Sequence, residues 1–293
     1  MKKVIVVGGA VIDIFAQPKD KFIMHDSNPG YLKKSLGGVA RNIAENLARL
    51  DIDTTLITVI GKDDGKKLIM QNAQEVMLKL SSVPVHQTPT YLSILDDQND
   101  MVAAIADMDE IELLSKDDIK KRDVIFQNSD YVVLDTNLKK ETIEHILKTY
   151  QNKEIYVDVI SCQKAEKIKS LYRYIYGIKL NLLEAKYLSG MEQEDILTIA
   201  KYFIAQGVKE VYITLGKDGS LFMSKNQMIK SVSHKVEVLN TAGAGDAFLA
   251  GVIYAKVKGY DPVIYAQKAA ILTLKSEKAV SELMNVKNLE ATK

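Results

Sequence analysis

The stretch from Asn240 to Phe248 has the residue types and spacing that a chemical step needs. Gly243 and Gly245 predict a tight turn, and Asp246 begins a run with helical spacing. Free N–H groups and the positive dipole end of such a helix start favour a phosphate group. Asp246 would repel that phosphate unless it accepts a proton from an attacking hydroxyl. An aspartate that merely complements the helix dipole is the alternative.

The rest of the chain supplies elements that would position this turn. An apolar strand predicted at 232–239 leads into it, and helices at 247–258 and 262–276 follow. Upstream, strands alternate with helices, which predicts an α/β fold with a doubly wound, mainly parallel sheet flanked by helices in a single domain, 1–293. The upstream strands are expected at 3–7, 54–60, 131–134, 154–159, 177–180 and 210–215, and the helices at 64–80, 139–150, 163–170 and 192–205.

A hairpin interrupts this alternation. Apolar stretches at 90–95 and 101–106 flank a polar turn, and an irregular stretch at 15–35 is expected to pack beside them. The segments 14–36 and 88–108 therefore predict a small β lid over a site. An exposed apolar face on such a hairpin also suits a contact between two copies of the chain, so a homodimer through the lid is expected.

Composition limits the partners. The chain has 39 Lys and Arg against 38 Asp and Glu, so its net charge favours neither a nucleic acid nor an anionic membrane. A small molecule is the expected partner. The single cysteine, Cys162, cannot form an internal disulfide, which suits the reducing cytoplasm.

Polar and glycine residues at strand ends are further candidates, because ligands bind beyond the carboxyl ends of parallel strands. Asp13 follows the first strand at a spacing that does not fit a dinucleotide-binding G-x-G-x-x-G motif, and it could hold paired sugar hydroxyls instead. Gly37 and Gly38 open a helix that carries Asn42. The remaining candidates are Asp135, Asn137, Asp158, Lys164, Asn181 and Glu184, and the glycine turn at 216–219. A structural role in caps and turns is the alternative for each.

Taken in order, these motifs resemble the ribokinase-like (PfkB) family of sugar and nucleoside kinases over essentially the whole chain. The resemblance implies that Asp246 is the catalytic base and that Ala242, Gly243, Ala244 and Gly245 form an anion hole for the transferred phosphoryl group. It implies a sugar site, an N-x-x-E motif that orders Mg2+ through water, and a loop for ATP. The sugar site would comprise Asp13, Gly37, Gly38 and Asn42. The N-x-x-E motif would be Asn181 and Glu184, and the ATP loop would contain Thr214, Gly216 and Gly219.

Two points bear on specificity. Asn240 stands where many members of the family carry aspartate, which puts in doubt the monovalent cation (K+) that the family's loop accommodates. The lid and pocket stretches resemble those of the nucleoside kinases in the family, and they add Asn137 and Lys164 as residues that contact the substrate. The implied reaction is phosphorylation of a nucleoside 5′-hydroxyl by ATP. A ribose or adenosine acceptor is the first alternative, and a non-catalytic sugar-binding protein the second.

Overall fold

One large sheet forms the centre of the computed structural model, which describes residues 2–232 and 236–292. Its strand order is β13-β12-β11-β10-β9-β8-β1-β4-β5. The strands from β5 to β11 are parallel, and β12 and β13 are antiparallel. The mainly parallel sheet predicted from the sequence is confirmed. The bounds are β1 (Lys3–Val7), β4 (Asp53–Ile60), β5 (Lys79–Pro84), β8 (Tyr131–Asp135), β9 (Glu154–Asp158), β10 (Gly177–Asn181), β11 (Glu210–Thr214), β12 (Ser220–Ser224) and β13 (Met228–Ser231).

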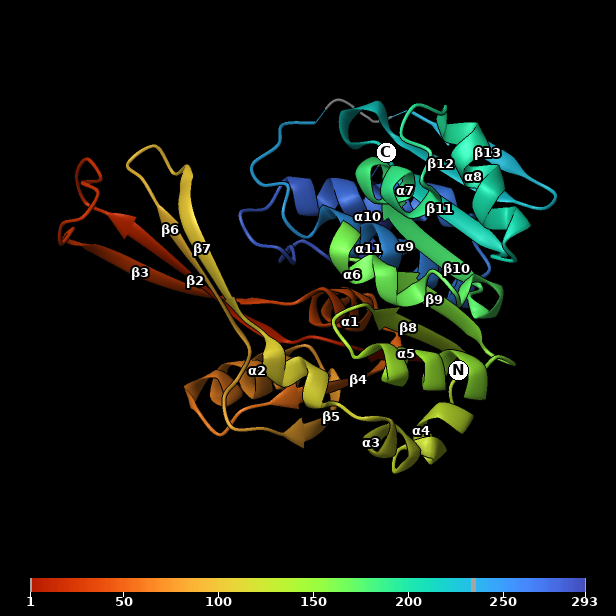
Figure 1. The fold of residues 1–293 in the computed structure, drawn as a ribbon, viewed down its shortest axis with the longest axis horizontal. Helices are drawn as coiled ribbons and strands as arrows, with labels where there is room; N and C mark the ends of the chain where they lie inside the picture. Colours follow the sequence, from red (N-terminus) through yellow and green to blue (C-terminus); the bar gives the residue numbers. More distant parts are fainter. Residues whose placement is uncertain (1, 233–235, 293) are drawn as a thin grey trace.

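Helices cover both faces of this sheet (Figure 1). Side chains of β1 alternate between the faces, as a pleated strand requires: Ile5 and Val7 pack into one apolar cluster, and Val4 and Val6 into the other. The first cluster includes α3 (Lys116–Lys120), α4 (Asp123–Gln127), α5 (Lys140–Thr149), α6 (Cys162–Ala165), α7 (Leu182–Ser189) and α8 (Ile196–Ala205). The second includes α1 (Val39–Arg49), α2 (Asp64–Glu75), α9 (Ala244–Lys258), α10 (Pro262–Leu274) and α11 (Val286–Ala291). Short 3-10 turns are η1 (Asp109–Leu113), η2 (Glu166–Ile168), η3 (Tyr172–Tyr174) and η4 (Gly216–Asp218).

A second, four-stranded sheet projects from the main body (Figure 1). Its order is β3-β2-β6-β7, with β2 (Val11–Pro18), β3 (Gly30–Gly37), β6 (Thr90–Leu95) and β7 (Met101–Asp107). The predicted hairpin is confirmed as the antiparallel pair β6–β7, and β2 pairs with β6, so the stretch near residue 15 does pack beside the hairpin. The sheet covers much of the segments expected to form a lid, and β2 and β3 extend past the first of them to Val11 and Gly37. Its action as a lid stays a prediction.

Three local predictions are wrong. The strand expected at 232–239 is absent at residue 232 and at 236–239, while residues 233–235 lie outside the described part. There the backbone N–H of Leu239 donates to Leu274 O at the end of α10 (2.9 Å) instead of joining a sheet. The helix expected to reach residue 80 ends at Glu75, because Met77 adopts φ +56° and the chain turns into β5. Much of the stretch at 15–35 lies in β2 and β3 rather than being irregular.

Candidate active site

The turn before α9 has the geometry of an anion site. Gly243 adopts φ +78°, and a Cβ there would collide with the carbonyl of Ala279. The helix starts at Ala244, so Gly245 and Asp246 lie in its first turn. First-turn N–H groups have no acceptor within their own helix. That of Ala244 donates to Thr241 O (3.3 Å), whereas those of Gly245 and Asp246 have no acceptor among the described residues and are available to a ligand. The structure thus places the predicted anion hole, Ala242 to Gly245, at a helix N-terminus that favours a phosphoryl group.

Asp246 is buried at this helix start, with 8% of its surface exposed. Its Oδ2 accepts a hydrogen bond of 2.7 Å from Asn42 Nδ2, so the first and last predicted motifs are in direct contact. Burial raises the pKa of Asp246 to about 6, and the charge of Asp158 adds to the rise. Lys179, the bond from Asn42 and Arg41 oppose it. At neutral pH the carboxyl is therefore ionised yet able to accept a proton, as a general base requires.

Lys179 was missed in the sequence analysis. It lies buried on β10, and its Nζ donates to Asp158 Oδ2 at 3.0 Å. A Cβ added to Gly245 would lie 2.7 Å from this Nζ, so the ammonium group sits directly beside the anion site. Burial alone lowers the pKa of Lys179, but the carboxylates of Asp158, Asp246 and Glu184 raise it above its usual value. The available signal was a lysine between two apolar residues of a buried strand.

Asn181 and Glu184 form a capping box at the start of α7. The Asn181 side chain accepts from the N–H of Glu184, and Glu184 Oε2 accepts from the N–H of Asn181, both at 2.8 Å. Glu184 is buried, and its burial raises its pKa, with the charge of Asp158 adding to the rise. A carboxylate can hold Mg2+ through the ion's bound water, because Mg2+ takes few protein ligands and keeps several waters. The residues present therefore fit a magnesium ion held near Glu184.

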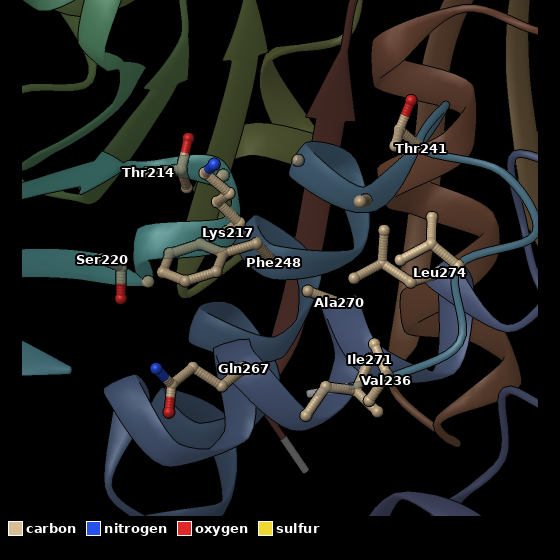
Figure 2. Close-up of a pocket in the computed structure, with 15 residues that line it drawn as sticks. Thr214, Lys217, Ser220, Val236, Thr241, Phe248, Gln267, Ala270, Ile271 and Leu274 are labelled. Carbon is tan, nitrogen blue, oxygen red and sulfur yellow. The ribbon is translucent and has the colours of Figure 1, made fainter. Parts of the chain in front are cut away.

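A cavity of about 480 Å³ opens beside the start of α9. Asn181 and Thr214 are register partners on neighbouring strands, so the two predicted nucleotide motifs meet here. Figure 2 shows side chains from β11, η4, α9 and α10 converging on this space. Its walls are mostly apolar, and Ser220 contributes a buried hydroxyl with no hydrogen-bond partner in the part of the chain that the structure describes. The lining residues are Thr214, Gly216, Lys217, Gly219, Ser220, Val236, Val238, Thr241, Ala244, Gly245, Phe248, Gln267, Ala270, Ile271 and Leu274.

This cavity fits the base and ribose of a nucleotide. Apolar walls with a few polar atoms are typical of small-molecule sites. The cavity includes Gly245 of the anion site, so a nucleotide lying in it would direct its phosphates at the start of α9. Thr214, Gly216 and Gly219, predicted for this purpose, all line it.

The residues predicted for the sugar lie on β2, at the end of β3 and at the start of α1, and Asn42 among them contacts Asp246. Asp13 is on β2, and its carboxylate occupies the space that a side chain at Gly37 would need. Gly38 adopts φ +92° and lies against the carbonyl of Gly9. Burial raises the pKa of Asp13 to about 6, and Arg41 opposes that rise. The structure brings Asp13, both glycines and Asn42 to the junction of the small sheet with α1.

Asn137 and Lys164 contact each other, since Lys164 Nζ donates to Asn137 Oδ1 at 2.5 Å. Asn137 Nδ2 donates to Asp135 Oδ2 at 3.0 Å, so protein groups already occupy much of this amide's capacity. Asp135 is buried, and it also accepts from the N–H groups of Gly9 (2.8 Å) and Ala40 (3.2 Å). Asp135 therefore fixes the backbone beside the sugar residues. Burial lowers the pKa of Lys164, and Asp135 counteracts this.

Both polar atoms of the Asn240 amide form hydrogen bonds within the protein. Its Nδ2 donates to the carbonyl of Glu277, and its Oδ1 accepts from the N–H of Ala242, both at 2.9 Å. The neutral amide thus ties the anion loop to the segment after α10, and it brings no negative charge to balance a cation. A K+ site at this loop stays a prediction.

Comparison with known proteins identifies the family and the fold. The model of the pfkB family of carbohydrate kinases matches residues 1–283. The chain belongs to this family. It is 31% identical to a pseudouridine kinase of Escherichia coli (strain K12), with 98% of this chain and 95% of that protein covered. It is 26% identical to a ribokinase of Staphylococcus aureus (strain COL), with 96% of each covered.

Solved structures agree in fold. A carbohydrate kinase from Agrobacterium tumefaciens superposes with a TM-score of 0.89 at 27% identity, covering 100% of this chain and 97% of that one. An Arabidopsis thaliana ribokinase complexed with ribose and ATP gives 0.84 at 22% identity, covering 100% and 99%. The ribokinase-like fold and the kinase activity expected from the sequence are confirmed: the protein is an ATP-dependent kinase of a sugar or nucleoside. In the described part of the chain no helix has the length and apolar character to cross a membrane.

Proposed function

We propose that this kinase transfers the γ-phosphoryl group of ATP to the 5′-hydroxyl of pseudouridine. One observation carries the chemistry: a buried carboxylate, Asp246, lies in the first turn of a helix whose start lines an apolar cavity, and it contacts Asn42 of the predicted sugar site. The substrate assignment is supported by the likeness to the E. coli pseudouridine kinase and by the same resemblance in the lid and pocket stretches.

The proposed step uses these groups in turn. Asp246 accepts the proton of the 5′-hydroxyl as its oxygen forms a bond to the γ-phosphorus, and the bond to the β,γ-bridging oxygen breaks to release ADP. The N–H groups around Gly245 and the Lys179 ammonium lie where negative charge develops on the phosphoryl oxygens. Asn181 and Glu184 would hold Mg2+ through water. When bound, Mg2+ neutralises charge on the nucleotide phosphates.

On the acceptor side, Asp13 would bind two neighbouring ribose hydroxyls. Lys164 has donors left after its bond to Asn137, so it is suited to a carbonyl of the base. Pseudouridine differs from uridine by an additional ring N–H beside the glycosidic carbon. A buried acceptor for that N–H would be left unpaired with uridine, which can discriminate by up to roughly ten-thousandfold.

The test is a comparison of catalytic efficiencies at fixed MgATP for pseudouridine, uridine, adenosine, ribose and fructose 6-phosphate. We expect pseudouridine to exceed every other acceptor by at least about tenfold. A better rate with ribose or adenosine would move the substrate to that compound and leave the kinase assignment intact. A ribose acceptor is the second candidate, given the similarity to the S. aureus ribokinase.

We also propose that two copies of the chain associate through the small sheet and that the enzyme works in the cytoplasm, where its one cysteine stays reduced. Every residue of the edge strand β7 is exposed, and β3 at the other edge of the sheet presents further exposed apolar side chains. Tyr31, Leu32, Met101 and Ile105 are each at least 62% exposed. We expect sedimentation to give a dimer and Ile105→Lys to give a monomer, with exposed Val124→Lys on α4 as the matched control. A monomeric wild-type protein would contradict this proposal.

A further inference from the structure

Arg41 lies between the two carboxylates of the proposed mechanism, but no step uses it. It is the third residue of α1 and is 2% exposed. A guanidinium group has five N–H donors and no acceptor. Five oxygen atoms of the protein accept hydrogen bonds from these donors. They are Gly37 O (2.9 Å from Nε), Leu36 O (3.0 Å from Nη2), Asn72 Oδ1 (3.3 Å from Nη1), Glu45 Oε2 (on Nη1) and Asn42 Oδ1 (on Nη2).

The contact with Asn42 determines which way its amide faces. Because a guanidinium can only donate, the atom of Asn42 that faces it must be the carbonyl oxygen. The NH2 group of the same amide then points at Asp246 and donates to its Oδ2 at 2.7 Å. The opposite rotamer would set NH2 against Arg41 and the amide oxygen against a carboxylate, which are two repulsive contacts.

The remaining contacts fix the other carboxylate. Leu36 and Gly37 end β3, where the small sheet returns to α1. The Asp13 carboxylate lies directly against Gly37, whose missing side chain leaves the space for it. By holding these two carbonyls, Arg41 fixes the backbone on which Asp13 rests.

The charge of Arg41 acts on the same two groups. It favours the ionised form of Asp13 and of Asp246, and so opposes the burial that raises the pKa of each. The other charged groups facing Asp246 are Asp158 from β9 and Lys179 from β10.

We propose that Arg41 is a positioning residue, which orients the Asn42 amide toward Asp246 and holds the end of β3 against Asp13. The catalytic carboxylate of Asp246 and the hydroxyls of the acceptor then keep a fixed distance and orientation. This inference rests on the proposed function, because it assigns Asp246 and Asp13 their roles. Arg41 lies within the stretch from Gly37 to Asn42, but the sequence analysis gave it no role.

The experiment compares Arg41→Met and Arg41→Lys with Arg49→Met as the matched control. Arg49 also pairs with Glu45 on α1 but makes no contact with Asn42 among the described residues. With pseudouridine and MgATP, or the best acceptor of the panel, we expect Arg41→Met to lower kcat by up to about a hundredfold. KM for ATP should stay near the wild-type value, and Arg49→Met should stay within about threefold in kcat.

The pH profile separates positioning from folding. Loss of the guanidinium charge should move the acid limb of kcat to higher pH in Arg41→Met, whereas Arg41→Lys, which keeps a charge but not the fork, should keep the limb and lose turnover. Circular dichroism and a denaturant midpoint check the fold. If Arg41→Met unfolds because the buried Glu45 keeps only Arg49 as a partner, the double variant Arg41→Met with Glu45→Met removes both charges and takes its place in the assay.

A double-mutant cycle with Asn42→Ala completes the test. If Arg41 acts through Asn42, introducing Arg41→Met into the Asn42→Ala variant should lower kcat by a further factor of less than about three. If the two residues act independently, their separate losses in kcat should multiply. Full turnover and an unshifted acid limb in a folded Arg41→Met protein would overturn the inference. An inactive wild-type enzyme on every acceptor would instead count against the proposed function.

Discussion

Replacing Asp246 by asparagine should abolish turnover and at the same time stabilise the fold. The amide fills the same space and can still contact Asn42, but it cannot accept a proton. Loss of a general base typically lowers the rate by about a hundred- to ten-thousandfold. The stability effect follows from burial, because the wild-type carboxylate is held ionised in a place that disfavours its charge.

The magnitude and its pH window follow from the pKa of Asp246. Folding raises that pKa from 3.8 to about 6, which corresponds to roughly 3 kcal/mol of destabilisation when the group is ionised. Above pH 6 the folded protein therefore carries the full penalty. As the pH falls from 6 toward 3.8 the folded carboxyl binds its proton first, and the penalty disappears. Asp246→Asn should exceed wild type in stability by about 3 kcal/mol at pH 7.5 and by roughly half of that at pH 5.

Denaturant unfolding of both proteins at the two pH values measures this difference, with kcat measured on the same preparations. Asp20→Asn is the matched control, since Asp20 is exposed and the same charge is removed there. We expect the control to change neither stability nor turnover. An Asp246→Asn protein that is less stable than wild type at pH 7.5 would refute the burial argument, and one that keeps more than about a tenth of wild-type turnover would refute the base assignment.

Three further outcomes are expected. In the wild type, kcat should fall below about pH 6 as Asp246 takes up its proton, and a pH–rate profile with saturating substrates shows whether the acid limb lies there. Lys179→Met should lower kcat by at least about a hundredfold in steady-state assays. It should also lower stability by about 3–5 kcal/mol in denaturant, because Asp158 loses its buried partner; an active, stable variant would contradict both roles. Asp13→Ala should reduce kcat/KM for the acceptor by roughly ten- to a hundredfold. Equal weakening of ATP in a nucleotide titration would assign Asp13 to the other substrate or to the fold.

The alternation of apolar strands and amphipathic helices was sufficient to predict the large sheet, because parallel strands buried on both faces have a distinctive sequence pattern. The strand predicted at 232–239 failed for a reason that the pattern does not contain. Val236 and Val238 are apolar because they line the cavity, and the neighbouring backbone bonds to α10. The strand β5 was missed because its sequence continues an apparent helix until Met77 takes a positive φ.

The site was predictable where backbone chemistry dictates residue type. Glycine occupies positions 38 and 243, where the backbone adopts a positive φ. Asp246 lies in the first turn of α9, directly after the second of these glycines. Arg41 and Lys179 were not predictable in this way, because charged residues in apolar stretches read as solvated until the structure shows what faces them. Some of their partners are distant in the sequence: Asn72, which accepts from Arg41, is 31 residues away, and Asp158, which accepts from Lys179, is 21 residues away on β9.

The hydrogen bond between Asn42 and Asp246 joins residues 204 positions apart. During synthesis, α1 leaves the ribosome long before α9, against which it packs in the finished protein. Contacts of such long sequence separation form slowly, and the unpaired apolar surface is exposed to aggregation in the meantime. A chain that terminates before residue 244 would carry the sugar residues without the base and would leave one face of its sheet largely uncovered. Phosphotransfer would thus appear only after the last part of the domain has folded, which makes catalytic activity a direct report of complete folding.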